Sequence, residues 1–276
     1  MEKRIGDIIA LRRKALNMTQ LQLAEKLGVS AQAVSKWENG SASPDVYLLP
    51  KIAQLLQTSV DALFGYRAAP QTEYESRYTA KDYYWGLIPS TMCYEALRLL
   101  PPVKKLRVLD IGCGEGKDAV FFARNGYSVS AFDAAESGLK KGIALAESCG
   151  VHVDFFRADV NDYFPNEKFD IVFSSGVFHY IHPERRAAFI EDIKNATNPG
   201  GLHLINAFVE KPFIAPPPDS ERAELENRQW KSGELFTCYH DWLLLKTEER
   251  IFDCKSGSIP HKHCMDVLIA QKPDIP

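Results

Sequence analysis

The spacing of apolar residues divides the chain into two parts. Up to residue 66, apolar positions recur every three or four residues without strand-like alternation, which predicts short helices. The first of these helices carries Ile5, Ile8 and Ile9, and the fourth runs through residues 48–56. Beyond residue 80, apolar runs of strand length alternate with helix-length segments. The polar stretch 66–79, which contains one proline and no sustained period, predicts a linker between two domains, 3–65 and 80–272.

Capping signals mark the ends of the short helices. Thr19 and Gln22 form a capping box that starts the second helix, and Gly28 suits the left-handed position that ends it. Ser30 can cap the third helix, which Asn39 and Gly40 close. Two short helices joined by a glycine-containing turn predict a helix-turn-helix, the geometry that places the second helix in the major groove of DNA.

The residues of this segment carry a specific resemblance. The runs 19–30 and 34–40 are similar to the phage-repressor-type (Xre) helix-turn-helix family, over residues 3–65. The resemblance implies a double-stranded DNA partner, bound by a homodimer that reads paired half-sites. It places base-reading positions at Ala31, Gln32 and Lys36, and phosphate contacts at Gln20 and Asn39. The alternative is a helical module that serves only dimerisation or protein interaction.

The second part has the pattern of a mixed α/β domain. Apolar runs predict strands, and the segments between them predict helices, over the following residues: strands 106–111, 129–132, 151–156, 169–173 and 202–208, and helices 117–125, 137–149 and 183–197. Such alternation predicts a mostly parallel sheet covered by helices on both faces. Two late apolar runs, 243–245 and 265–270, have no convincing helix between them and predict an antiparallel edge.

A glycine-rich loop lies where the first strand passes into a helix. It reads Gly112-Cys113-Gly114-Glu115-Gly116, with Asp110 two residues before it. Open α/β sheets bind ligands at this edge, and glycines let a ligand approach the backbone. The GxGxG spacing differs from a pyrophosphate clamp, and no Gly-Lys-Ser/Thr ending follows. An acid in the loop would repel a pyrophosphate but suits a cationic sulfonium and an amino group.

These residues resemble the class I S-adenosylmethionine-dependent methyltransferases, a Rossmann-like family, over about residues 80–272. The resemblance implies that Asp110, Gly112 and Gly114 hold the methionine moiety of the cofactor and that Asp133 takes the ribose hydroxyls. It also implies that Asp159, followed by Val160, faces the adenine and that Ser174 lines the cleft.

Flanking residues narrow the resemblance. The aromatic run 83–85 and the stretches 198–201 and 230–235 are similar to the tellurite-resistance branch of this family. That likeness implies chalcogen oxyanions as methyl acceptors. A Leu-His-Arg stretch that supplies substrate-side residues in that branch has no counterpart near residues 248–255, so the acceptor stays open between a chalcogen oxyanion and a thiol.

The acceptor is expected to be a small molecule rather than DNA. The place after the fourth strand reads Ser174-Ser175-Gly176-Val177, without the Asn/Asp-Pro-Pro-aromatic tetrapeptide of amine-methylating enzymes, and the sequence contains no Pro-Cys nucleophile. Methyl transfer needs little acid–base work, so no catalytic base is assigned. Candidates for the cleft wall are Tyr84, Trp85, His179 and Tyr180.

The distribution of charge supports DNA binding by the first part and not by the second. Residues 1–66 carry eight Lys/Arg against six Asp/Glu, whereas the remaining residues carry 25 against 30. Only the mildly basic first part therefore suits a polyanion. The sequence shows no signal-peptide pattern and no long apolar run, so we expect a cytoplasmic protein with reduced cysteines and no membrane partner.

Two alternatives concern the remaining features. The second part could sense S-adenosylmethionine without catalysis and so control the DNA-binding part. Cys254, His261 and His263 could in addition bind a soft metal, but no fourth ligand has convincing spacing. We therefore expect an edge strand with polar residues toward the cleft and no metal.

Overall fold

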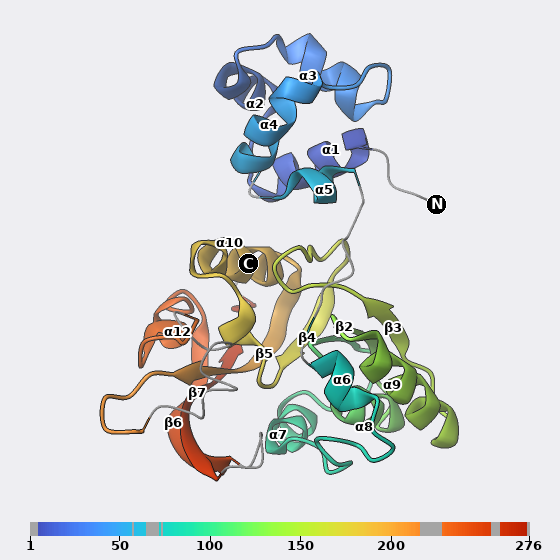
Figure 1. Ribbon diagram of the computed structural model, residues 1–276, viewed down its shortest axis with the longest axis vertical. Helices are drawn as coiled ribbons and strands as arrows, with labels where there is room; N and C mark the ends of the chain where they lie inside the picture. Colours follow the sequence, from blue (N-terminus) through green and yellow to red (C-terminus); the bar gives the residue numbers. More distant parts are fainter. Residues whose placement is uncertain are drawn as a thin grey trace. The chain divides into compact units, whose positions relative to one another are not determined.

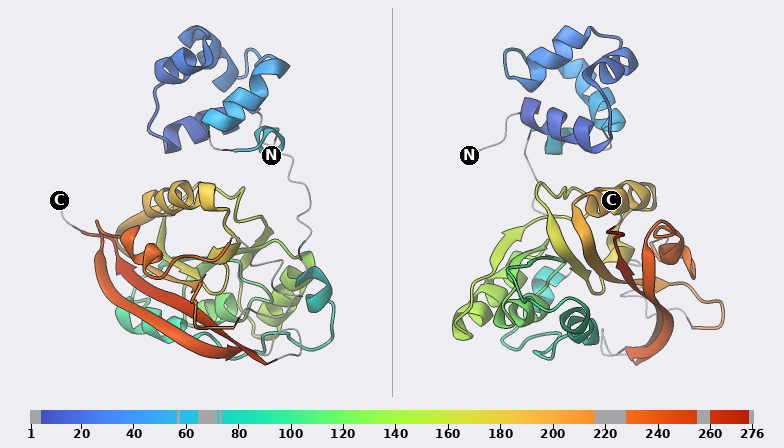
Figure 2. Two further views of the ribbon diagram at one scale, coloured as in Figure 1. Left: turned by 60° about the vertical axis from the view of Figure 1, so that its left-hand side comes forward. Right: turned by 180° about the vertical axis from the view of Figure 1, so that it is seen from behind.

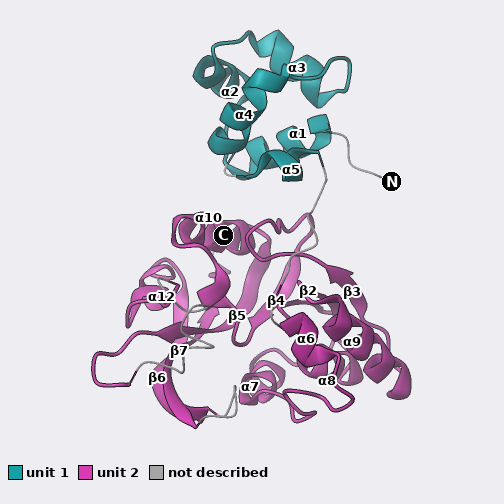
Figure 3. Cartoon of the chain, in the orientation of Figure 1, with its two compact units in different colours: residues 1–70 teal, residues 71–276 magenta. Residues whose placement is uncertain are grey.

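The computed structural model describes residues 5–56, 58–64, 72, 74–215, 228–254 and 260–274. The chain forms two compact units, Met1–Pro70 and Gln71–Pro276 (Figure 3). Each unit has its own hydrophobic core. Among the described residues, no helix is both long and apolar enough to cross a membrane.

The first unit is a bundle of short helices. Its elements in order are α1 (Ile5–Ala15), α2 (Gln20–Leu27), α3 (Ala31–Glu38), the 3-10 helix η1 (Val46–Leu48), α4 (Leu49–Leu55) and α5 (Val60–Leu63). The predicted capping box of Thr19 and Gln22 is confirmed, as are the Ser30 cap and the left-handed Gly28. Helix α5 was not predicted because its four residues are too few to show a helical period.

The second unit is built on a seven-stranded sheet (Figure 1). Its strands are β1 (Arg107–Ile111), β2 (Ser128–Asp133), β3 (Asp154–Arg157), β4 (Phe169–Ser174), β5 (Thr197–Val209), β6 (Leu243–Cys254) and β7 (His261–Gln271). The order is β3-β2-β1-β4-β5-β7-β6. The first five strands are parallel, whereas β7 runs antiparallel to both β5 and β6. The predicted mixed α/β fold with an antiparallel edge is confirmed.

Helices cover both faces of this sheet. One layer consists of α7 (Thr91–Leu99), α8 (Lys117–Arg124) and α9 (Glu136–Ser148). The other contains the 3-10 helix η2 (Phe178–Tyr180), α10 (Pro183–Asn195) and α12 (Glu234–Thr237). Successive strand residues point to opposite faces, so Val108 packs in the first layer and Leu109 in the second. Strand order reverses between β1 and β4, which is where open α/β sheets bind their ligands.

The two last strands are much longer than the sequence pattern indicates. They pair from Leu243 to Cys254 on one side and from His261 to Gln271 on the other, and both views in Figure 2 show them as long strands at one edge of the sheet. The pattern predicted only 243–245 and 265–270. Most residues of β6 are exposed, so the apolar alternation that identifies a half-buried strand is missing there.

One helix lies within the segment predicted as linker. Helix α6 (Tyr74–Tyr78) packs against α9, where the Ser137 amide donates to the Glu75 carboxylate at 3.2 Å and the Ser137 hydroxyl to the Glu75 carbonyl at 2.9 Å. Five residues are too few to show a period, so tertiary contacts rather than sequence pattern identify this helix. Residues 66–71 and 73 of the segment lie outside the described residues.

Candidate active site and nucleic-acid interface

The glycine loop follows β1 and adopts a backbone that other residues avoid. Gly112, Gly114 and Gly116 have φ angles of 68°, 53° and 81°, in the left-handed region. A Cβ atom at Gly112 would lie 2.2 Å from the Val177 side chain, and one at Gly114 would lie 2.9 Å from the Tyr78 hydroxyl. The loop therefore needs glycine both for its turns and for its close approach to neighbouring residues.

Asp110 lies beneath this loop with an incompletely bonded carboxylate. Its side chain is buried, and Oδ2 has no hydrogen-bond partner among the described residues. Burial raises the pKa of Asp110 well above its usual range, and the nearby Asp118 carboxylate adds to the effect. A buried oxygen without a partner costs about 1–3 kcal/mol, so it is the kind of group that a bound donor would satisfy.

Asp133, at the end of β2, is drawn to the same loop. Its Oδ2 accepts the Gly114 amide and its Oδ1 accepts the Ala135 amide, both at 2.8 Å. Burial raises the pKa of Asp133, while these two amides and the Ala134 amide act in the opposite direction. A carboxylate has about four acceptor positions, so with three backbone amides bound it keeps capacity for about one further donor, such as a hydroxyl group.

The remaining predicted cofactor residues have different surroundings. Asp159 is half-buried, and its Oδ1 accepts from the backbone and side-chain nitrogens of Asn161 at 2.8 and 3.0 Å. Val160 is buried beside it in the core. The Ser174 hydroxyl is fully buried and donates to the Ile111 carbonyl at 3.0 Å, so it joins β4 to β1. Ser175, the next residue, lines a cavity instead.

Aromatic side chains gather beside the glycine loop. The predicted residues Tyr84, Trp85 and Tyr180 each lie within 6.5 Å, between ring centroids, of Tyr74. The Trp85 indole donates to the Tyr78 hydroxyl at 3.0 Å. The pattern of the chain did not indicate Tyr74 or Tyr78, because both lie in the segment predicted as linker.

Glu115 and Lys141 connect this aromatic cluster to the loop, and of the two only Lys141 was not indicated by the sequence. Glu115, the acid inside the glycine loop, is buried and pairs with Lys141 of α9 at 2.7 Å. Its other carboxylate oxygen accepts the Trp85 amide at 3.3 Å. The sequence indicated Glu115 as a loop acid that suits a cationic sulfonium, whereas in the structure its charge is paired with Lys141.

His179, predicted as a residue of the cleft wall, is packed inside the second unit. It is buried, and its ring stacks on Phe208 at 4.4 Å between centroids with an interplanar angle of 2°. Burial lowers the pKa of His179 to about 3, so the ring is neutral at pH 7. Its Nδ1 atom has no hydrogen-bond partner among the described residues. A neutral, stacked ring favours a packing role over that of a base.

A cavity of about 420 Å³ opens on the sheet face that carries α7. Ser175 and Asn206, near the ends of β4 and β5, line it on one side, and Lys246 and Arg250 of β6 line it on another. Asn206 also accepts the Gly176 amide at 2.6 Å, which ties the loop after β4 to β5. The volume is that of a pocket for a small molecule.

In the first unit, the predicted DNA-reading residues lie on α3 and its flanks. Gln32 and Lys36 are exposed and four residues apart, so they share one face of the helix, whereas Ala31 is half-buried. Asn39 is exposed, and its Oδ1 accepts the Ser41 amide at 2.9 Å.

A charged pair that the sequence analysis missed supports Gln20. The Glu38 carboxylate accepts from Gln20 at 2.8 Å and pairs with Arg13 of α1 through two bonds of 2.6 and 2.9 Å. Burial acts to raise the pKa of Glu38, but the hydrogen bonds from Arg13 and Gln20 lower it overall. This pair joins α1, α2 and α3 and holds Gln20 in place.

Comparison with known proteins agrees with both units. Residues 9–63 match a helix-turn-helix family, and residues 108–201 match a family described as a methyltransferase domain. The chain is 24% identical over 198 residues to a probable S-adenosyl-L-methionine-dependent methyltransferase, TehB, of Haemophilus influenzae; the match covers 72% of this chain and 64% of TehB. It is 30% identical over 174 residues to Hemagglutinin 1 of Eikenella corrodens, covering 62% of this chain and 55% of that protein. The chain thus spans between half and two thirds of the length of these relatives.

Solved structures share the fold of the second unit. The crystal structure of TehB from Haemophilus influenzae matches with a TM-score of 0.58 at 22% identity, covering 72% of this chain and 65% of that one. NodS from Bradyrhizobium japonicum, solved with S-adenosyl-L-homocysteine, matches with a TM-score of 0.52 at 14% identity, covering 72% of this chain and 97% of that one. The chain therefore carries an Xre-type helix-turn-helix domain and, after it, a methyltransferase domain of the S-adenosylmethionine-dependent class that resembles the tellurite-resistance branch.

Proposed function

We propose that the chain is a DNA-binding transcriptional regulator whose second unit transfers a methyl group from S-adenosylmethionine to a small molecule. The observation that carries the catalytic part is the buried Asp110 carboxylate, whose Oδ2 no described residue hydrogen-bonds, beneath three left-handed glycines. Such a group destabilises the protein when no ligand is bound and is stabilised when a donor binds.

The residues of the loop suit the parts of this cofactor. Asp110 can accept from the amino group of the methionine moiety, and Asp133 has acceptor capacity left for a ribose hydroxyl. When bound, S-adenosylmethionine supplies a methyl group already activated by its sulfonium. The chain then has to bind, orient and exclude water rather than move a proton.

The acceptor is proposed to occupy the cavity of about 420 Å³. Ser175 and Asn206 line this cavity, and they lie at the sheet edge that also carries the glycine loop. Lys246 and Arg250 add two cations to that lining and Glu95 adds one carboxylate, while Glu248 pairs with both cations at 3.0 Å. A small polar or anionic nucleophile, such as a thiol or a chalcogen oxyanion, fits this lining better than a base flipped from DNA.

Cofactor binding is tested by calorimetric titration with S-adenosylmethionine. Asp133→Asn should weaken binding about tenfold or more, because an amide replaces one acceptor oxygen with a donor. Asp154→Asn, at the exposed start of β3, is the matched control and should bind as the unmodified protein does. Absence of binding by the unmodified protein would refute the proposal.

The acceptor class is tested with cofactor labelled in its methyl group. Label should pass to small thiols, selenite or tellurite and not to duplex DNA. Transfer to DNA at a rate comparable with that to any of these small acceptors would exclude the small-molecule assignment. Tight cofactor binding without transfer to any acceptor would favour the sensor alternative.

For the first unit, we propose that a dimer binds half-sites about one helical turn apart. Selection from random duplexes should enrich a paired sequence. Gln32→Ala and Lys36→Ala should then weaken binding by about 1–3 kcal/mol each and relax specificity. Lys51→Ala, an exposed lysine on α4, is the control and should have little effect. A selection without enrichment would favour the interaction-module alternative.

A further inference from the structure

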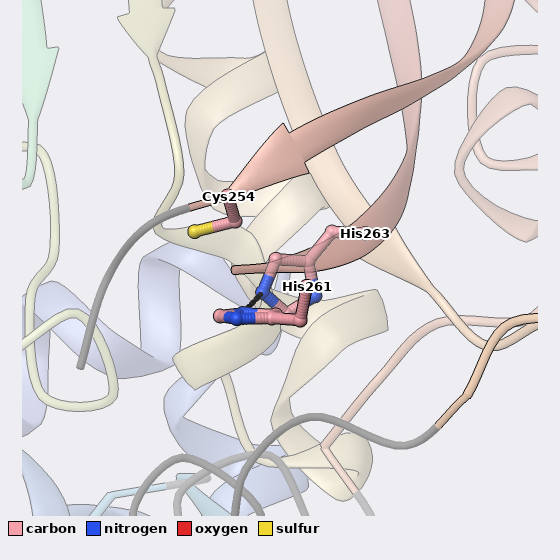
Figure 4. A group of neighbouring side chains, drawn as sticks. All are labelled: Cys254, His261 and His263. Carbon is pink, nitrogen blue, oxygen red and sulfur yellow. Dashed lines mark hydrogen bonds between the residues drawn. The ribbon is translucent and has the colours of Figure 1, made fainter. Parts of the chain in front are cut away.

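Three potential metal ligands converge where β6 ends and β7 begins, at the connected end of the β6–β7 hairpin. Figure 4 shows Cys254 from the end of β6 beside His261 and His263 from the start of β7. The sulfur of Cys254 and one ring nitrogen of each histidine lie within 4.8 Å of one another. The Nε2 atoms of the two histidines are 2.8 Å apart.

Strand pairing explains why these side chains meet. Cys254 lies opposite His261 in the antiparallel register, and Phe252 lies opposite His263. Residues two apart on a strand share a face, so all three potential ligands lie on the same face of the hairpin. Directly opposed residues have Cβ atoms about 4.5–5.5 Å apart, close enough for one ion to reach both side chains.

The positions of the ring nitrogens are close to those of a bound pair. Two histidine nitrogens in a tetrahedral zinc site, each 2.0–2.1 Å from the metal, lie about 3.3 Å apart. An opening of about 0.5 Å from the 2.8 Å contact would reach that spacing. His261 and Cys254 are only half-buried, so their side chains have room for this adjustment.

The third ligand is held firmly by its surroundings. His263 is 4% exposed, and its ring stacks on Phe208 at 4.8 Å with an interplanar angle of 12°. Phe208 in turn stacks on His179. Cys254 and His261 therefore adjust to the His263 ring, whose plane is already fixed. Fewer side chains then have to become ordered when a metal binds.

We propose that Cys254, His261 and His263 form a binding site for a borderline-soft transition-metal ion, with zinc as the reference case. Thiolate and imidazole ligands select such ions over Mg²⁺ and Ca²⁺, which take oxygen ligands. Three protein ligands leave the fourth tetrahedral position to water or a small ligand. The sequence offered no fourth protein ligand with convincing spacing, but a site of this kind does not require one.

The site adjoins the proposed acceptor cavity. Phe252, the strand partner of His263, lines that cavity together with Met265 of β7. Metal binding here nevertheless requires neither the cofactor nor methyl transfer. A chain that binds zinc but not S-adenosylmethionine would retain this site and refute the proposed function alone.

The first test is a titration of the full chain, freed of metal by a chelator, with Zn²⁺ against a chromophoric competitor. One equivalent should bind, and Mg²⁺ should not compete. Cys254→Ser and His261→Gln should each weaken binding by more than the roughly 10- to 100-fold that loss of an outer-shell partner costs. Cys149→Ser and His240→Gln, outside the hairpin, are the matched controls and should leave the affinity unchanged.

The second test uses the unmodified protein, so it does not depend on how the variants fold. Zn²⁺ should slow alkylation of Cys254, located by mass spectrometry, and leave alkylation of Cys149 unchanged. Replacement by Co²⁺ should give a thiolate-to-metal charge-transfer band that Cys254→Ser removes. No zinc binding by the full chain, or binding that persists unchanged in both ligand variants without protection of Cys254, would overturn the proposal.

Discussion

The Asp110 carboxyl group lies buried at the end of β1 with one oxygen that no described residue hydrogen-bonds. Its burial next to Asp118 disfavours the charged form, and its pKa is raised accordingly. A residue in this position lowers the stability of the protein without ligand while it prepares the site for a donor. If Asp110 holds the cofactor as we propose, stability and cofactor binding respond to it in opposite directions.

Asp110→Asn separates these two effects. The substitution keeps the shape of the side chain and removes the buried charge, so the free energy of unfolding without ligand should stay the same or rise. Affinity for S-adenosylmethionine should fall about tenfold or more, since a charge-assisted hydrogen bond to an amino group is worth about 1.5–3 kcal/mol. Denaturant unfolding and calorimetry measure the two quantities. A large loss of stability with unchanged affinity would contradict this assignment.

His179 is a second single residue with a measurable effect: it makes the free energy of unfolding depend on pH. Its pKa in the folded protein is about 3, below the value of about 6.5 for an unfolded chain. The stability that it contributes is therefore full above pH 6.5 and is lost as the pH falls toward 3. Between pH 7 and pH 5 the free energy of unfolding should fall by about 2 kcal/mol through this residue.

His179→Phe, which keeps an aromatic ring against Phe208, should remove that part of the pH dependence. The measurement is denaturant unfolding of both proteins at pH 7 and pH 5. His152→Gln, an exposed histidine, serves as the control and should behave as the unmodified protein. Equal losses in His179→Phe and the unmodified protein would show that His179 is not kept neutral by burial. His203, buried in β5 between Thr197 and Tyr239, also has a lowered pKa and should account for part of any remaining loss.

At the scale of elements, the helix-turn-helix unit depends on how closely α1 approaches α3. A Cβ atom at Gly6 would lie 1.8 Å from the Trp37 carbonyl oxygen, a distance that only displacement of the backbone can relieve. Gly28, which ends α2, has open space around it but a φ angle of 76°. The two glycines are thus required for different reasons, helix contact and backbone conformation.

Alanine substitutions distinguish these reasons. Gly6→Ala should destabilise the protein by about 3 kcal/mol or more, because overpacking forces the helices apart. Gly28→Ala should cost about 1–2 kcal/mol, the strain of a left-handed backbone with a Cβ atom. Thermal unfolding followed by circular dichroism measures both. Similar stabilities for the two variants would argue against a close contact of α1 with α3.

At the scale of the whole molecule, we expect the segment between the two hydrophobic cores to contain the first sites of proteolytic cleavage. We propose domains at 3–65 and 80–272 with a linker between them, but α6 packs on α9 through Glu75 and Ser137. Trypsin should therefore cleave after Arg67 before it cleaves after Arg77, whose guanidinium lies 4.7 Å from the Tyr74 ring. Mass spectrometry of a time course decides the order. Earlier cleavage after Arg77 would show that α6 is less stable than its contacts indicate.

Much of this protein follows from local rules that sequence expresses directly. The capping box at Thr19 and the left-handed turn at Gly28 depend on neighbours a few residues away, so their residue types predict them. The alternation of strand and helix periods similarly predicts the parallel sheet and its antiparallel edge. The glycine loop with Asp110 could be located because its backbone demands those residues.

Other features depend on contacts between distant residues and could not be predicted. Helix α6 and the exposed strand β6 carry too little periodicity, and packing against α9 and pairing with β7 determine them. The Glu38–Arg13 pair and the Glu115–Lys141 pair join residues 25 and 26 positions apart.

The cluster at the end of the β6–β7 hairpin shows the difference most clearly. Spacing along the chain indicated that His261 and His263 share a face, but only the strand register brings Cys254 against them. Sequence determines what a residue can do within its own turn or strand, because those contacts follow a fixed period. Tertiary structure decides which distant groups meet, because that depends on how whole elements pack.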